Sequence, residues 1–185
     1  KGLIKILNKK TGLNLKILLM DEKEKAIGFM VSSPPFRPVM IFSDLLYKLL
    51  NKKEFEWVAL HESGHYLMWH NLKMAVTEIL VGLIGIIFLS SFSFGVVMQI
   101  FLAILLAIIY IQLAKILEYQ ADYFAIANMD DPRGVISGNL KMKKVNLTLD
   151  GNKLLQWMWV IQVPYEKRIE MAKKEILRRK YSPSH

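Results

Sequence analysis

The chain contains no cysteine among its 185 residues. Disulfide bonds are therefore excluded, and so is any metal site that depends on thiolate ligands. A zinc site in this chain would have to be built from histidine and carboxylate side chains. Histidine is itself scarce, with 4 residues in the whole chain. The absence of cysteine also fits a reducing compartment, where disulfides are rare.

Charged residues and histidine are absent from the stretch Ile79–Ala114. One helix of this length would be about 54 Å long, whereas the hydrocarbon core of a bilayer is about 30 Å thick. Two spans joined by a tight turn fit better, and Ser90–Gly95 supplies turn residues. We therefore predict a transmembrane helical hairpin over residues 74–117, with spans at Met74–Leu89 and Gly95–Leu117. The alternative is a buried hairpin of a soluble protein, which a chain of this size could hardly bury.

A hairpin returns the chain to the side of the membrane that it left. Lys73 and Lys115 flank the two inner ends of the predicted hairpin, and the connecting turn carries no charge. Because loops rich in lysine and arginine tend to stay in the cytoplasm, we expect the parts of the chain outside the hairpin to be cytoplasmic. The expected location is the cell membrane, with the functional site on its cytoplasmic side.

The net charge of +9 is concentrated toward the C-terminus, in Asn139–His185. Such an excess fits nucleic acid or an anionic membrane surface. No recognisable nucleic-acid-binding module accompanies it, so we expect a lipid bilayer and no nucleic acid as partner. Trp157 and Trp159 could anchor their segment at the membrane interface or pack it against the rest of the chain. The first residue is Lys1 rather than Met, so we expect a fragment or a processed form, in which spans further upstream would not be seen.

The pattern ahead of residue 60 predicts a mainly helical fold with a small β-sheet, of the α+β class, in a single domain over residues 1–185. A basic amphipathic stretch at the N-terminus predicts a short helix. Alternating apolar segments between turn residues predict three strands, at Leu15–Met20, Ala26–Ser32 and Val39–Phe42. Ser43 or Asp44 can cap a following helix, and another helix starts near Glu54. An edge of this sheet could hold an extended peptide by strand addition, or the sheet could be purely structural.

The segment His61-Glu62-Ser63-Gly64-His65 matches H-E-x-x-H, a zinc-protease motif. Residues four apart lie on one face of a helix, so both imidazoles can bind one metal ion. Glu62 lies one step round the helix and can reach a water molecule on that metal without binding the metal itself. Zinc lowers the pKa of such a water to about 7, and a carboxylate base can then take its proton. Gly64 costs helix stability but could allow another segment to approach closely.

A second acidic pair, Glu118 and Asp122, comes directly after the predicted hairpin. These residues are also four apart, and the hairpin brings them back to the level of the two histidines. We therefore expect Glu118 to be the third ligand of one zinc ion, and Asp122 to accept a hydrogen bond from a ligating imidazole. Glu78 would lie about 20 Å from His65 on a continuous helix and is not expected to share the metal. His70, five residues past His65, is expected to point away from the metal face.

These motifs together resemble the HtpX-like membrane zinc metallopeptidases, whose broader family includes the CAAX prenyl proteases and the mitochondrial Oma-type proteases. Three further stretches are similar to that family: Val39–Leu46, Asp131–Leu140 and Pro164–Ile169. The resemblance covers about Val39 to Met171, with the sequence between Asn146 and Val163 unmatched. The two metal motifs in tandem are highly specific, whereas each of the other stretches is weak by itself.

The chain departs from this family at Val163, where a histidine before the late proline is common. If that histidine normally stabilises the oxyanion, another group must take the role. The first candidate is Arg168, which matches the family's arginine and could equally form a structural ion pair with Glu118 or Asp122. Weaker candidates are three tyrosines: Tyr119, Tyr123 and Tyr165.

The resemblance implies a membrane-embedded zinc endopeptidase that acts on membrane or misfolded proteins in quality control. Glu62 would be the general base and, later, the proton donor to the leaving amine. Two alternatives stay open. One is a non-catalytic zinc-binding membrane protein that works as a sensor or adaptor, for which Val163 is the support. The other is prenyl-protein processing, within the same chemistry.

Overall fold

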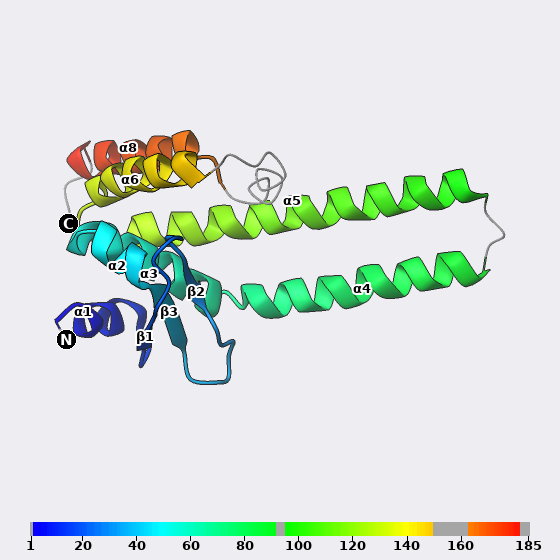
Figure 1. The fold of residues 1–185 in the computed structure, drawn as a ribbon, viewed down its shortest axis with the longest axis horizontal. Helices are drawn as coiled ribbons and strands as arrows, with labels where there is room; N and C mark the ends of the chain where they lie inside the picture. The colour runs from blue at the N-terminus through cyan, green and yellow to red at the C-terminus, as the bar shows by residue number, and fades with distance from the viewer. Residues whose placement is uncertain (1, 92–94, 150–162, 182–185) are drawn as a thin grey trace.

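A small sheet and the shorter helices packed beside it form one end of the molecule, and a helical hairpin extends from it (Figure 1). This computed structural model describes residues 2–91, 95–149 and 163–181. The first half contains α1 (Gly2–Thr11), β1 (Lys16–Met20), β2 (Gly28–Met30), β3 (Val39–Ser43), α2 (Asp44–Leu49) and α3 (Lys52–Leu67). The second half contains α4 (His70–Ser91), α5 (Val96–Asn128), α6 (Arg133–Leu149) and α8 (Tyr165–Tyr181). The mainly helical fold with a small sheet confirms the predicted class.

The sheet is mixed, with strand order β1-β3-β2. β3 lies in the centre, parallel to β1 and antiparallel to β2. Its alternate residues Met40 and Phe42 are fully buried, as expected for a strand with one face on the core. All three strands lie where the sequence predicted them. The order leaves β2 at an edge, and this edge faces the functional site.

Helix α3 crosses the middle of the fold and packs against α1, β2, α5 and α6. Its start is fixed by a capping box: the Asn51 side chain accepts a hydrogen bond from the Glu54 N–H, and the Glu54 carboxylate accepts one from the Asn51 N–H. Phe55 then packs edge-on against Phe42, with ring centroids 4.6 Å apart. These contacts hold one end of α3 against the sheet and set the direction of the histidines that follow.

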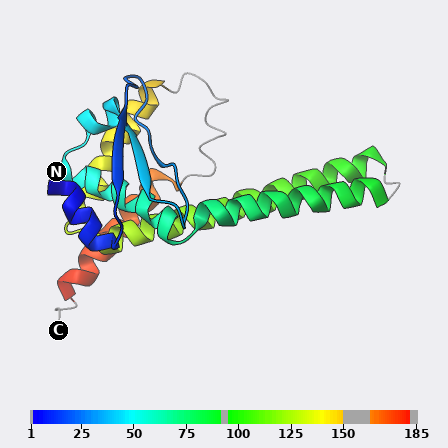
Figure 2. The same ribbon diagram turned by 90° about the horizontal axis from the view of Figure 1, so that it is seen from below.

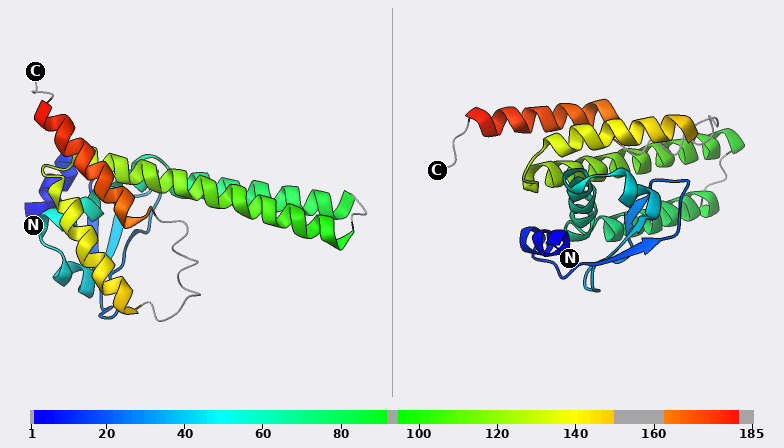
Figure 3. Two further views of the ribbon diagram at one scale, coloured as in Figure 1. Left: turned by 90° about the horizontal axis from the view of Figure 1, so that it is seen from above. Right: turned by 60° about the vertical axis from the view of Figure 1, so that its left-hand side comes forward.

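Helices α4 and α5 lie side by side and leave the rest of the molecule together (Figures 2 and 3). Both are long and apolar enough to cross a membrane, and none of their most apolar stretches is buried. The two helices pair as a helical hairpin, in which α4 begins earlier than expected and α5 continues past Leu117 to Asn128. Tyr110 donates a hydrogen bond to Glu78 across 2.7 Å and links the two helices. Residues 92–94 of the predicted turn, as well as Trp157 and Trp159, lie outside the described residues.

Helix α3 ends at a sharp change of direction. Leu67 is its last residue, and Trp69 has a φ of 58°, in the left-handed region that bulky side chains rarely adopt. α4 starts at the next residue, His70. The segment from α3 to α4 is therefore not one continuous helix, and this break changes the environment of His70.

Helix α8 is attached to the C-terminal end of α5. Its Arg179 donates hydrogen bonds to the carbonyl oxygens of Ala127 and Met129, at 3.0 and 2.9 Å. Ala127 is in the last turn of α5 and Met129 is its C-cap, so no further helical N–H is present to bind these carbonyls. The half-buried Arg179 is held in turn by Glu175, 2.7 Å away. The contact stabilises the helix that carries the acidic motif.

Candidate metal centre

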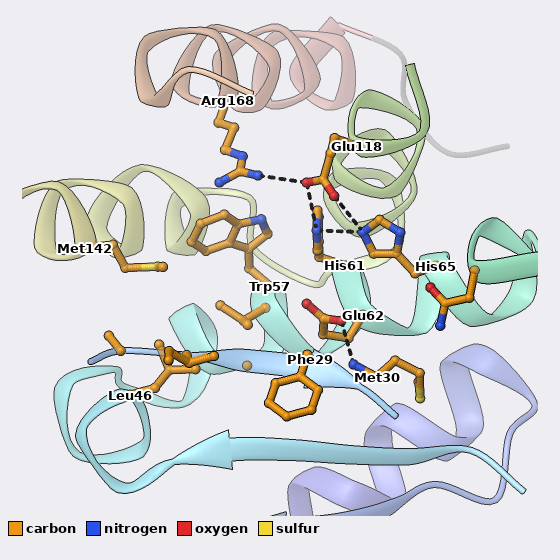
Figure 4. A pocket seen from close by; sticks show the side chains of 15 residues that line it. Phe29, Met30, Leu46, Trp57, His61, Glu62, His65, Glu118, Met142 and Arg168 are labelled. Carbon is orange, nitrogen blue, oxygen red and sulfur yellow. Dashed lines mark hydrogen bonds and ion pairs between the residues drawn. The ribbon is translucent and has the colours of Figure 1, made fainter. Parts of the chain in front are cut away.

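Three side chains from two helices converge at one point. His61 and His65 extend from one face of α3, and Glu118 extends from α5 (Figure 4). The Nε2 atoms of the histidines are 3.1 Å apart, and the Glu118 carboxylate oxygens lie 3.6 Å from His61 Nε2 and 3.3 Å from His65 Nε2. Their donor atoms all lie within 4.8 Å of one another. Two imidazole nitrogens and a carboxylate are a donor set that fits zinc and leaves a fourth position open.

Gly64 lets the two helices come this close. A Cβ atom at Gly64 would lie 3.3 Å from the Ala121 Cα and 3.2 Å from the Phe124 ring. Glycine has a lower helix propensity than most other residues, but its lack of a side chain at this position allows α3 to pack directly on α5. This agrees with the expectation that Gly64 allows another segment to approach.

Asp122 and Arg168 support His61. The Asp122 Oδ1 lies 2.9 Å from His61 Nδ1, and Arg168 Nε donates to Asp122 Oδ2 across 2.7 Å. Asp122 is completely buried and Arg168 is 6% exposed, so the pair is shielded from solvent. Burial alone favours a neutral His61, but the adjacent Asp122 carboxylate outweighs it and, with Glu118 and Glu62, raises the pKa of His61 to about 9 in the metal-free protein.

His70 lies against the site, contrary to the sequence-based expectation. Its Nδ1 is 3.0 Å from His65 Nδ1, and its Nε2 is 3.2 Å from the Gln120 Oε1. The expectation assumed one continuous helix, on which a residue five positions on points elsewhere. The break at Trp69 turns the chain so that His70, only 2% exposed, returns to His65. No sequence signal marks this contact.

Glu62 lies beside the three converging side chains and is fastened to the sheet. Its Oε2 accepts a hydrogen bond from the Met30 N–H of β2, across 2.9 Å (Figure 4). Burial raises the pKa of Glu62, and the neighbouring histidines only partly oppose this rise. A carboxylate with a raised pKa is a stronger base than one in water, as a general base requires.

A cleft of about 400 Å³ opens beside these residues. One wall is the edge strand β2, which contributes Gly28, Phe29 and Met30, and another is formed by Trp57 and Met142. The described residues that line the cleft also include the following: Ala26, Ile27, Leu46, Val58, His61, Glu62, His65, Asn71, Glu118 and Arg168. The cleft thus joins an apolar region to the polar centre.

The candidates for oxyanion stabilisation differ in position. Arg168 lines the cleft and also lies 3.6 Å from Glu118, in addition to its bond with Asp122. Among the described residues that line the cleft there is no tyrosine, so Tyr119 and Tyr123 lie outside it. The geometry supports the ion-pair interpretation of Arg168. Glu78, bonded to Tyr110, is not part of the metal-binding group formed by the described residues.

Comparison with solved structures places the fold. The fold is similar to the crystal structure of S. mikatae Ste24p, with a TM-score of 0.66, 17% sequence identity, and coverage of 92% of this chain and 49% of that chain. The chain therefore spans about half the length of that structure, and at this identity the likeness concerns the fold alone. No curated protein matches the sequence significantly.

A family comparison covers most of the chain. The model of peptidase family M48 matches residues 8–173, a range that contains every residue of the centre described above. Peptidases of this family bind zinc, in agreement with the donor set of His61, His65 and Glu118. On the extent of this match, the chain belongs to peptidase family M48.

Proposed function

We propose that the chain is a membrane-embedded zinc endopeptidase that cleaves membrane or misfolded proteins on the cytoplasmic side of the cell membrane. The observation that carries this proposal is the arrangement around one cleft. His61, His65 and Glu118 bring their donor atoms within 4.8 Å of one another, and Glu62 lies beside them on the same cleft. A purely structural metal site has no need of an additional carboxylate in this position.

In this proposal His61, His65 and Glu118 hold one zinc ion. When bound, zinc supplies Lewis acidity that polarises a carbonyl and lowers the pKa of a water molecule to about 7. Asp122 accepts the Nδ1 proton of His61, which leaves the Nε2 lone pair of that ring directed at the centre. Arg168 neutralises the buried Asp122 and keeps it ionised.

Glu62 moves the proton. Its carboxylate takes a proton from the attacking water as the water oxygen forms a bond to the peptide carbonyl carbon. It then gives this proton to the amide nitrogen as the carbon–nitrogen bond breaks, so that the carboxylate is regenerated. The raised pKa of Glu62 brings it closer to neutral pH, which suits both the uptake and the release of the proton.

The substrate is expected to lie as an added strand along β2. The carbonyl of Ile27 accepts a hydrogen bond from the Ser43 N–H, and the Val31 N–H donates to the Val39 carbonyl, so these residues face β3. In an antiparallel pair the alternate residues, Gly28 and Met30, direct their backbone groups away from the partner strand. An extended peptide on this edge would pass beside Glu62, because the Met30 N–H already donates to that carboxylate.

Membrane embedding is proposed from α4 and α5. Their apolar stretches are long enough to cross a bilayer and are not buried against other described residues. Lys73 and Lys115 lie at the end of the hairpin that joins the metal centre, and positive charge favours the cytoplasmic side. The cleft would therefore lie just outside the bilayer, within reach of segments of membrane proteins that emerge from it.

The proposal is tested by reconstituting the full chain in liposomes with an unfolded, membrane-anchored reporter protein. We expect cleavage that stops when zinc is removed by a chelator and that is lost in Glu62→Gln, whereas Glu24→Gln, a change at an exposed carboxylate, behaves as wild type. Reporters confined to the outside or to the inside of the liposomes show on which side of the membrane cleavage occurs. Protease protection determines how the chain is oriented in the same liposomes. Undiminished cleavage by Glu62→Gln contradicts the mechanism. Zinc binding without cleavage by the wild type would favour the sensor or adaptor alternative.

A further inference from the structure

The two histidines of the centre are supported in different ways. His61 Nδ1 contacts a carboxylate, Asp122, at 2.9 Å. His65 Nδ1 instead contacts another imidazole, that of His70, at 3.0 Å, and the far nitrogen of His70 contacts the amide oxygen of Gln120 at 3.2 Å. His65 is thus connected to the imidazole of His70 on α4, and His70 in turn to the amide of Gln120 on α5; neither of these groups carries a charge.

The chemistry of these atoms permits one consistent set of protons when a metal ion is bound. If His65 binds the metal through Nε2, its Nδ1 carries the proton and must donate. His70 Nδ1 then accepts this hydrogen bond and carries no proton, so the proton of the neutral His70 ring is on Nε2. That N–H meets the Gln120 Oε1, which is an acceptor only. Each donor in the series therefore finds an acceptor, and no charged group is needed.

The backbone is arranged so that His70 reaches this place. Trp69 has a φ of 58°, a conformation that costs a bulky residue free energy and persists only where the surrounding structure enforces it. The result of this turn is that His70, at the start of α4, is 2% exposed and has polar contacts at both ring nitrogens. A histidine that served only to fill space would not need either contact.

We propose that His70 and Gln120 are positioning residues that hold the His65 ring in its metal-binding tautomer and orientation. The proposal rests on the proposed metal site. His70 acts through His65 and does not touch the metal or the substrate. Because the acceptor is neutral, it orients His65 without adding negative charge beside Glu118. Groups of this kind commonly change metal affinity by about 10- to 100-fold when removed.

The test measures zinc affinity by competition with a chromophoric chelator, on the full chain in detergent. We expect His70→Leu, which removes the acceptor, to weaken zinc binding by about 10- to 100-fold. His70→Asn offers a side-chain oxygen near the position of Nδ1 and should restore most of the affinity. A purely space-filling role predicts the reverse order, since leucine fills the buried site better than asparagine.

A second pair of variants, at Gln120, tests the same contacts without a substitution at the buried position of His70. Gln120 is exposed, so Gln120→Leu should fold as wild type, which thermal unfolding in the absence of zinc verifies. We expect Gln120→Leu to weaken zinc binding by roughly 10-fold, and Gln120→Glu, which keeps an oxygen acceptor but adds a charge, to bind zinc more tightly than Gln120→Leu. Wild-type affinity in both His70→Leu and Gln120→Leu overturns the proposal.

Failure of the positioning role and failure of the metal site give different results. If the wild type binds zinc and His61→Ala does not, the metal site stands whatever the His70 and Gln120 variants show. If the wild type binds no zinc, or binds it equally well in His61→Ala, the metal site itself is wrong and the positioning role falls with it.

Discussion

The Met30 N–H donates a hydrogen bond to Oε2 of Glu62 across 2.9 Å, so α3 is bonded directly to β2, an edge strand of the sheet. Glu62 comes from α3 and Met30 from β2, and both line the same cleft. The Glu62 carboxylate is thus held next to the edge of β2, along which an added peptide strand would lie. One contact therefore couples the proposed base to the position of its proposed substrate.

Two substitutions of Glu62 separate its chemical role from its structural one. Glu62→Gln keeps a side-chain oxygen that can accept the Met30 N–H, whereas Glu62→Ala leaves this donor without its partner. We expect both variants to lose about 10²- to 10⁴-fold in kcat, because neither can take a proton. Only Glu62→Ala should also lose about 1 kcal/mol of unfolding free energy. Peptide cleavage assays and chemical unfolding measure the two effects, and equal kcat in Glu62→Gln and wild type would exclude the base role.

Arg168→Met tests whether the arginine acts through the buried ion pair. The substitution leaves Asp122, which is completely buried, without its guanidinium partner. Removing one member of such a pair costs about 3–5 kcal/mol. We expect a lower unfolding temperature and weaker zinc binding, measured by calorimetry and chelator competition.

The matched control for Arg168→Met is Lys167→Met, at the adjacent exposed position of α8. This change should alter the unfolding free energy by less than about 0.5 kcal/mol. If Arg168→Met instead keeps its stability and zinc affinity but loses kcat, the oxyanion role is favoured over the ion pair.

Zinc is expected to stabilise the folded chain. Binding to the folded state alone contributes about 4 kcal/mol when the free metal is 1,000 times the dissociation constant. A thermal scan of the metal-free protein should therefore shift upward when zinc is added and return when a chelator is added. His65→Ala removes one donor of the centre and should abolish most of the shift. An equal shift in His65→Ala would place the bound metal elsewhere.

Acid should loosen the attachment of α8 to α5. The hydrogen bond from Arg178 holds the pKa of Glu175 at about 2, below its ordinary value of 4.5, although partial burial opposes this. A pKa that falls on folding contributes stability that is fully present above pH 4.5 and is lost as the pH falls through 2. The contribution is on the order of 2 kcal/mol, with allowance for the exposed Arg178.

Unfolding measurements between pH 6 and pH 2 check this contribution. Glu175→Gln should be less stable than wild type at pH 6, and the difference between the two proteins should shrink toward pH 2. Glu24→Gln, at an exposed position, serves as the control and should follow the wild-type curve. A difference that stays constant with pH would show that the Glu175 charge does not contribute.

The metal centre was predictable because its elements repeat with the period of a helix. His61 and His65 are four residues apart, as are Glu118 and Asp122, and the apolar stretch between the pairs indicated that the chain returns to its starting side. The ion pair of Arg168 with Asp122 was one of two alternatives that the residues left open. Periodicity cannot choose between them, because the choice depends on how α8 packs against α5.

The parts that could not be predicted depend on single backbone angles and on strand order. His70 was expected to point away, and the prediction was wrong because Trp69 adopts a left-handed conformation that its residue type does not indicate. The contact of Met30 with Glu62 requires β2 to be an edge strand next to α3. The three strands were predicted, but their spatial order is set by packing of residues far apart in the sequence.

Helix α5 carries an apolar stretch and the Glu118–Asp122 pair without an interruption, from Val96 to Asn128. A continuous helix without a break moves as one rigid element, so a tilt or rotation at one end also moves the other end. In a bilayer, a change in thickness that tilts the apolar part of α5 would therefore be expected to displace the Glu118 carboxylate relative to the two imidazoles of α3. If the chain spans a bilayer as proposed, we therefore expect zinc affinity and peptide cleavage to vary with the thickness of the membrane.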